Sequence, residues 1–256
     1  MDKLEMIAGK DQLTYGSNGT VSTLYMKGKN LLYPPKRNDL GQLRGGIPIC
    51  VPFGKNAELF GWPSHGILRN TDMVPRLSQG SKVFLTSSDA KLFGKYNEMP
   101  FEMNAIYTYG FLNASTFGMS VAIEQHNEKG KSIPSNMCFH PYFLTPNDSR
   151  EPSKTIEVKA GDTSFQIRDM QLGDCKKGKM LPMPKDGKVE IIIPSQGTII
   201  MTAPKFGALN IWRDSLDFIC IEPVETFPEL FNTEKGSFMN PDREIKLSMF
   251  LEFIEE

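Results

Sequence analysis

The chain has 256 residues, 39% of them apolar, and a formal net charge of −1, a composition typical of a globular protein with a large core. The balanced charge argues against binding to nucleic acid or to an anionic membrane through a broad basic surface. The N-terminal segment lacks a signal-peptide core, and no stretch approaches the roughly 20 apolar residues of a transmembrane helix. We therefore expect a cytoplasmic protein with a small-molecule partner. Its oligomeric state is not predicted by the sequence.

Alternation of apolar and polar residues is the main pattern along the chain. In chain order it occurs at residues 21–26, 119–123, 189–193, 198–202 and 245–253. A period of two is typical of strands with one buried face, and in the last stretch that face would be Ile245, Leu247, Met249, Leu251 and Phe253. Turn-forming residues bound several of these stretches, and 22 glycines and 18 prolines leave little room for helices. We predict an all-β fold, a large antiparallel β-sandwich that spans residues 1–256 as a single domain.

Two segments interrupt the alternation. Residues 43–70 are rich in glycine and proline, and residues 138–146 read CFHPYFLTP. Loops of this density often carry function or close the edge of a sandwich. We expect candidate functional residues in both.

The four cysteines are scattered at Cys50, Cys138, Cys175 and Cys220, with no C-x-x-C pair. This spacing indicates neither a zinc ribbon nor a thioredoxin-type motif. Three of the four lie inside apolar runs, where a free buried thiol is the usual outcome. We expect reduced, structural cysteines.

The three histidines differ in their surroundings. His126 lies at the polar end of a strand, where a structural role is expected. His65 lies beside a glycine in the first loop, and His140 is held between an aromatic residue and a proline in the second. From context alone, a structural and a functional role are about equally plausible for His65 and His140.

Glu222 ends an apolar strand and shares a strand face with Phe218 and Cys220. A carboxylate in that position is either a salt-bridge partner or a tuned acid/base group. His65, His140 and Glu222 lack the short spacing of a metal motif, so no metal site is predicted. No nucleophile elbow and no phosphate-binding glycine loop is present.

Three blocks in order resemble the aldose 1-epimerase superfamily, and most closely its hexose-6-phosphate 1-epimerase branch. The first block is RGGIPIC from Arg44, followed by PFG at 52–54, HG at 65–66 and RN at 69–70. The second is HPYF from His140, and the third is Trp212 with CIEP at 220–223. Together with the strand pattern, the resemblance covers nearly the whole chain.

The resemblance implies a galactose mutarotase-like sandwich that binds a sugar on a concave sheet face. It implies His140 as general acid, Glu222 as general base and His65 as a second histidine beside the sugar. Arg44, Arg69 and Trp212 match motif positions that line the substrate pocket, where an arginine can bind phosphate through two parallel hydrogen bonds. The alternative for both arginines is a loop-stabilising contact with backbone carbonyls.

The expected reaction interconverts α and β anomers of an aldohexose or aldohexose 6-phosphate by ring opening and reclosure, and it needs no cofactor. It needs one group that donates a proton and one that accepts a proton, and we expect Glu222 to support a charged His140. Two alternatives stay open. One is a non-catalytic carbohydrate-binding protein of the same fold, and the other is a different carbohydrate-active enzyme, although a glycosidase normally needs two carboxylates.

Overall fold

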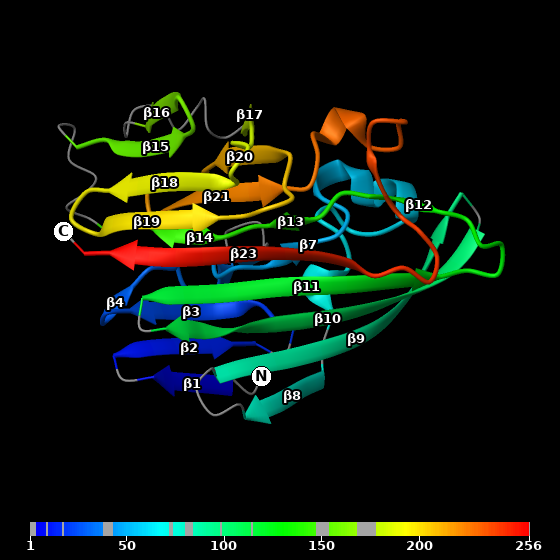
Figure 1. Cartoon of the computed structure of the whole chain (residues 1–256), viewed down its shortest axis with the longest axis horizontal. Coiled ribbons are helices and arrows are strands. Elements are labelled where there is room, and N and C mark those ends of the chain that lie inside the picture. The colour runs from blue at the N-terminus through cyan, green and yellow to red at the C-terminus, as the bar shows by residue number, and fades with distance from the viewer. Residues whose placement is uncertain are drawn as a thin grey trace.

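The computed structural model describes residues 4–8, 10–16, 18–37, 43–71, 74–79, 84–97, 99–113, 115–146, 154–167 and 178–255. Its regular structure is almost entirely antiparallel β, as predicted. The largest sheet has nine strands in the order β16-β15-β18-β19-β23-β11-β10-β9-β8. In Figure 1, β23 and β11 run across its middle. The strands are β8 (Val74–Gln79), β9 (Phe84–Tyr96), β10 (Met99–Asn113), β11 (Thr116–His126), β15 (Ile156–Ala160), β16 (Thr163–Ile167), β18 (Lys188–Ile193), β19 (Gly197–Thr202) and β23 (Ile245–Ile254).

A second sheet of six strands packs against the first and carries the candidate site. Its path is β17-β20-β21-β13-β7, and β14 also pairs with β21. The strands are β7 (Ile49–Cys50), β13 (Cys138–Phe139), β14 (Tyr142–Leu144), β17 (Lys179–Pro182), β20 (Ala208–Trp212) and β21 (Phe218–Val224). In Figure 1, β20 and β21 overlap β18 and β19 of the larger sheet in the view, since the two sheets are stacked.

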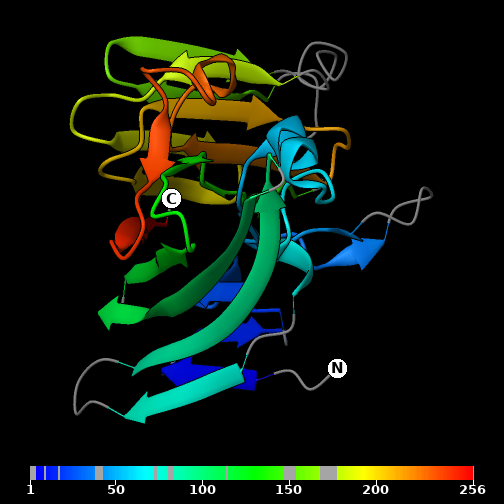
Figure 2. The same cartoon turned by 90° about the vertical axis from the view of Figure 1, so that its right-hand side faces the viewer.

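Smaller sheets and short 3₁₀ helices complete the described chain. Figure 2 shows β9 and β10 curving along their length, with η1 close to one end of β9. Within the described ranges, no helix is long and apolar enough to cross a membrane. The elements are β1 (Leu4–Ala8), β2 (Asp11–Tyr15), β3 (Val21–Met26) and β4 (Lys29–Asn30) in one sheet, β5 (Lys36–Arg37) with β6 (Leu43–Arg44), β12 (Ile133–Ser135) with β22 (Ser237–Met239), and the helices η1 (Gly54–Phe60), η2 (Leu68–Asn70) and η5 (Pro228–Leu230).

The main core lies between the two large sheets. Leu247, Met249 and Leu251 of β23 belong to the same apolar cluster as Ile219 and Ile221 of β21. Ser248 and Phe250, which lie between them on β23, are less buried and belong to the opposite face, as a period of two requires. The predicted buried face of the last strand is therefore confirmed, and so are the four other predicted strands, which correspond to β3, β11, β18 and β19.

Strand β21 is buried on both faces, and the two faces differ in role. Its odd-numbered residues Ile219 and Ile221 enter the main core. The even-numbered residues, Phe218, Cys220 and Glu222, lie on the opposite face, as predicted. Cys50, Cys138 and Cys220 are buried and free, whereas Cys175 lies outside the described residues. The second face of β21 thus supplies the site.

Candidate active site

A pocket of about 130 Å³ lies against this second face. Its described lining comes from β20, β21, β6 and the loops predicted to carry function: Arg44, Phe53, His65, His140, Tyr142, Asn210, Trp212 and Glu222. Aromatic rings form much of the wall, and two ionisable groups face one another inside it. This combination of an apolar wall with a few convergent polar groups is typical of small-molecule sites.

His140 is fixed by its neighbours on the turn between β13 and β14. Its backbone N–H donates to the Pro48 carbonyl at 3.0 Å. The imidazole stacks on the Tyr142 ring, with centroids 4.7 Å apart and planes inclined by 7°, and Trp212 meets it edge-on at 6.0 Å. The ring is 3% exposed, and its Nδ1 has no hydrogen-bond partner among the described residues. Its other nitrogen, Nε2, lies 3.5 Å from Glu222 Oε1.

Glu222 is fully buried on the pocket face of β21. Its Oε2 accepts a weak hydrogen bond from the Cys138 thiol at 3.7 Å, and Asn210, its direct partner on β20, also hydrogen-bonds the carboxyl group. Oε1 has no hydrogen-bond partner within the described chain. One carboxyl oxygen is therefore held by the protein, and the other faces His140.

Burial sets the charge of this pair. It raises the pKa of Glu222 to about 8. Hydrogen bonds with Asn210 and Cys138 lower this pKa, but by less than burial raises it. Burial also lowers the pKa of His140 well below its usual range, and the positive charge of Arg69 adds to that effect. Burial of both groups therefore works against the charged imidazole that was expected, and favours the neutral imidazole and the neutral carboxyl group in the unliganded pocket.

His65 approaches the pair from the loop after η1. Its backbone has φ = +73°, and its ring lies 5.6 Å from the His140 ring. The next residue, Gly66, has φ = +80°, and a Cβ there would lie 1.9 Å from the Val51 carbonyl oxygen, so only glycine fits. Burial, with Arg69 and Arg44 nearby, lowers the pKa of His65 to about 4. His65 is therefore a neutral hydrogen-bonding group beside the pair.

The two predicted arginines have different positions. Arg44 lines the pocket, with its guanidinium group 5.1 Å from the Trp212 ring centroid and 3.4 Å from Asp214 Oδ2. Arg69 does not line it. Arg69 is buried behind Tyr142, donating to the Tyr142 hydroxyl at 3.3 Å and to the Leu43 carbonyl. This is the loop-stabilising alternative, in which the arginine holds the ring on which His140 stacks.

No protein-family model and no curated protein matches the chain. Solved structures match along nearly its whole length. A galactose mutarotase-like protein from Clostridium acetobutylicum has a TM-score of 0.76 at 13% identity, covering 99% of this chain and 95% of that one. A galactose mutarotase-like protein from Lactobacillus casei has a TM-score of 0.72 at 16% identity, and the match covers 99% of this chain and 100% of that one. A galactose 1-epimerase from Lactobacillus acidophilus has a TM-score of 0.69 at 13% identity, and the match covers 99% of this chain and 94% of that one.

The chain has the galactose mutarotase-like fold. This agrees with the resemblance seen in the sequence. At these identities the similarity shows the fold, and any argument about the reaction has to come from the site, since one fold hosts many functions.

Within this galactose mutarotase-like fold, five of the six predicted site residues line one pocket, and Arg69 supports it from behind. Sequence reasoning missed three lining residues: Phe53, Tyr142 and Asn210. A signal for Asn210 was present, because it lies two residues before Trp212 on the same face of β20.

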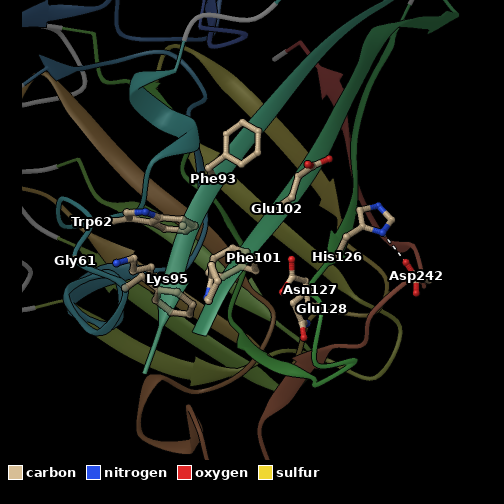
Figure 3. A pocket seen from close by; sticks show the side chains of 13 residues that line it. Gly61, Trp62, Phe93, Lys95, Phe101, Glu102, His126, Asn127, Glu128 and Asp242 are labelled. Carbon is tan, nitrogen blue, oxygen red and sulfur yellow. Dashed lines mark hydrogen bonds and ion pairs between the residues drawn. The ribbon is translucent and has the colours of Figure 1, made fainter. Parts of the chain in front are cut away.

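A larger groove of about 760 Å³ lies elsewhere on the galactose mutarotase-like fold (Figure 3). Figure 3 shows Phe93, Trp62 and Phe101 on one side of it and His126 with Asp242 on another. His126 Nδ1 lies within hydrogen-bonding distance of Asp242 Oδ1. Neither His140 nor Glu222 lines the groove, so the smaller pocket is the candidate active site.

The groove and the pocket share a loop. Phe60, at the end of η1, stacks on Trp62 at 5.2 Å and lies 4.9 Å from the Tyr96 ring of β9. Trp62 also packs on Phe101 of β10 at 5.7 Å. These rings fix the middle of the loop on the large sheet, while its ends carry Phe53 and His65 into the pocket.

Proposed function

We propose that the protein is a sugar 1-epimerase that interconverts the α and β anomers of an aldohexose. The observation that carries this proposal is the contact of His140 Nε2 with Glu222 Oε1, 3.5 Å apart within a pocket lined by aromatic rings. The similarity in fold to a galactose 1-epimerase supports it. No charged group other than this pair is required by the reaction.

The chemistry is a proton relay across the hemiacetal. Glu222, as base, takes the proton of the C1 hydroxyl while His140, as acid, gives a proton to the ring oxygen. The C1–O bond to the ring oxygen breaks, and a carbonyl forms at C1. After rotation about C1–C2, the ring oxygen attacks the other carbonyl face, and both protons return to their donors. Positioned acid/base groups typically contribute about 10²–10⁴-fold.

The pair shares one proton throughout this cycle. Ring opening starts from imidazolium and carboxylate and ends with imidazole and carboxylic acid, which is the arrangement that burial favours in the unliganded pocket. The two arrangements contain the same number of protons. Hydrogen bonds from the sugar hydroxyls to the unpartnered Glu222 Oε1 would favour the carboxylate and so move the proton to His140.

A neutral hexose suits the pocket better than a hexose phosphate. Among the described lining residues, Arg44 is the one lysine or arginine, and Asp214 offsets its charge. Arg69, the second arginine expected to bind phosphate, faces a backbone carbonyl and Tyr142 instead. The aromatic rings of Tyr142 and Trp212 offer apolar surface to the C–H face of a sugar ring.

Polarimetry on freshly dissolved α-D-glucose and α-D-galactose, with a coupled assay on α-glucose 6-phosphate, tests the proposal. We expect acceleration with a free hexose, a loss of about 100-fold or more in His140→Ala, and wild-type rates in the matched control His126→Ala. A better rate with the phosphate would refute the substrate assignment. Sugar binding without acceleration of any sugar would refute the epimerase and indicate a carbohydrate-binding protein.

A further inference from the structure

The pocket face of β21 brings together three kinds of metal-binding side chain. Cys220 and Glu222 are two residues apart and so lie on the same face of the strand. His140 reaches them from the neighbouring β13–β14 turn. One ligand atom from each of these three buried residues lies within 4.8 Å of the others. Their separation in the sequence explains why no metal motif was predicted.

The spacing is close to that of a zinc site. With bonds of about 2.0–2.3 Å, ligand atoms around a tetrahedral zinc ion lie roughly 3.3–3.8 Å apart. His140 Nε2 and Glu222 Oε1 are already 3.5 Å apart. The widest separation, at most 4.8 Å, needs a movement of about 1 Å to reach that range.

A second observation points to a ligand between these groups. Glu222 is fully buried, yet its Oε1 has no hydrogen-bond partner among the residues that the structure describes. A buried carboxyl oxygen without a partner costs free energy unless something satisfies it. This oxygen faces His140, at the position where an ion would sit.

We propose that His140, Cys220 and Glu222 form a binding site for a divalent cation of the zinc class, with its fourth coordination position open to the pocket. The thiolate ligand selects zinc or cadmium over magnesium and calcium, which prefer oxygen ligands only. Three protein ligands and one open position are the pattern of catalytic zinc sites, whereas structural zinc sites have four protein ligands. The Cys138 thiol contacts the other carboxyl oxygen of Glu222 and is not a ligand in this arrangement.

Binding must release protons, since a metal takes a thiolate and a carboxylate. Affinity should therefore increase with pH. If the protein is the epimerase proposed above, the bound ion also occupies its acid/base pair and stops ring opening.

Cadmium titration tests the site directly, through the ultraviolet charge-transfer band of a cadmium–thiolate bond. All proteins carry Cys175→Ser, because that cysteine lies outside the described residues. In this background we expect one cadmium ion per chain, and an affinity for Cys220→Ser lower by more than about 100-fold, beyond the loss typical of outer-shell changes. The matched control Cys138→Ser removes a neighbouring buried thiol and should keep the band.

Equal binding by the background protein and Cys220→Ser, or the absence of any band, overturns the proposal. Loss of binding in Cys138→Ser alone overturns the ligand assignment. Circular dichroism and a denaturation midpoint for each variant show that it is folded. The spectroscopic result is independent of enzymatic activity, so a protein that fails the polarimetric test can still pass this one. Where hexose turnover is present, zinc should inhibit the background protein and not Cys220→Ser, each measured against its own metal-free rate.

Discussion

Replacement of Glu222 by glutamine should stabilise the protein near neutral pH. An exposed glutamate has a pKa of 4.5, and burial raises that of Glu222 to about 8. Between these values the unfolded chain has released a proton that the folded chain still binds. The free energy of unfolding of the wild type therefore falls as the pH rises, by about 1.4 kcal/mol per pH unit.

The size of the effect follows from that slope. From pH 4.5 to pH 7 the wild type loses about 3 kcal/mol at this one residue, which is a large share of the roughly 5–15 kcal/mol that stabilises a typical domain. Glu222→Gln keeps the volume and a carbonyl oxygen for Asn210 and Cys138, and it has no proton to lose. The two proteins should be similar in stability near pH 4.5 and differ by about 3 kcal/mol at pH 7 in favour of the variant.

Urea denaturation of both proteins at several pH values between 4.5 and 8 measures this difference. Gln166→Asn, at an exposed position without a titratable side chain, is the control and should keep the pH dependence of the wild type. A difference between wild type and Glu222→Gln that stays constant with pH would refute the reasoning, because it would mean that the carboxyl group titrates alike in the folded and unfolded chains. If the more stable variant also loses epimerase activity, the wild-type glutamate lowers stability at a position that the activity requires.

Three further predictions concern the same pocket. If the proposed epimerase activity is present, its kcat/KM should be nearly constant from about pH 6 to 7 and decrease as the pH passes about 8, when the acid/base pair loses its shared proton. A rise between about pH 7 and 9 would contradict this assignment. Arg69→Met should lower the free energy of unfolding by about 2–4 kcal/mol, because it leaves the Tyr142 hydroxyl and the Leu43 carbonyl without their buried donor. A denaturation midpoint equal to that of the wild type would make Arg69 a candidate substrate ligand again. Gly66→Ala should cost about 3 kcal/mol or more, measured by thermal unfolding, since its Cβ would overlap the Val51 carbonyl, and a wild-type melting temperature would contradict the strained geometry of that loop.

The fold could be predicted because its evidence is local. The alternation in residues 245–253 gives both the strand β23 and its buried face, since side chains on a strand change sides at each residue. The same rule placed Glu222 and Cys220 on one face of β21. Most residues of the pocket could be predicted for a different reason. They are far apart in the chain, but the three motifs that resemble the family include them.

The features that the sequence did not predict depend on how distant segments pack together. Nothing in the sequence around Arg69 says that its guanidinium group turns behind Tyr142. The sequence shows that His140 and Glu222 can pair, but it does not show the cost of burying both groups, which works against the charged forms in the unliganded pocket. Cys220 was recognised as buried, but its distance from the imidazole depends on the strand pairing that brings the β13–β14 turn beside β21.

Phe60 and Trp62 form an aromatic anchor in the middle of the loop of residues 53–65, and this anchor gives the middle and the ends of the loop different roles. Residues in its middle pack on the large sheet, and residues at its ends line the candidate pocket. Substitutions at Phe53 or His65 should therefore change the shape of the pocket without detaching the loop from the large sheet. If the protein is the epimerase proposed above, its substrate range can be altered through these few end positions while the anchor stays unchanged.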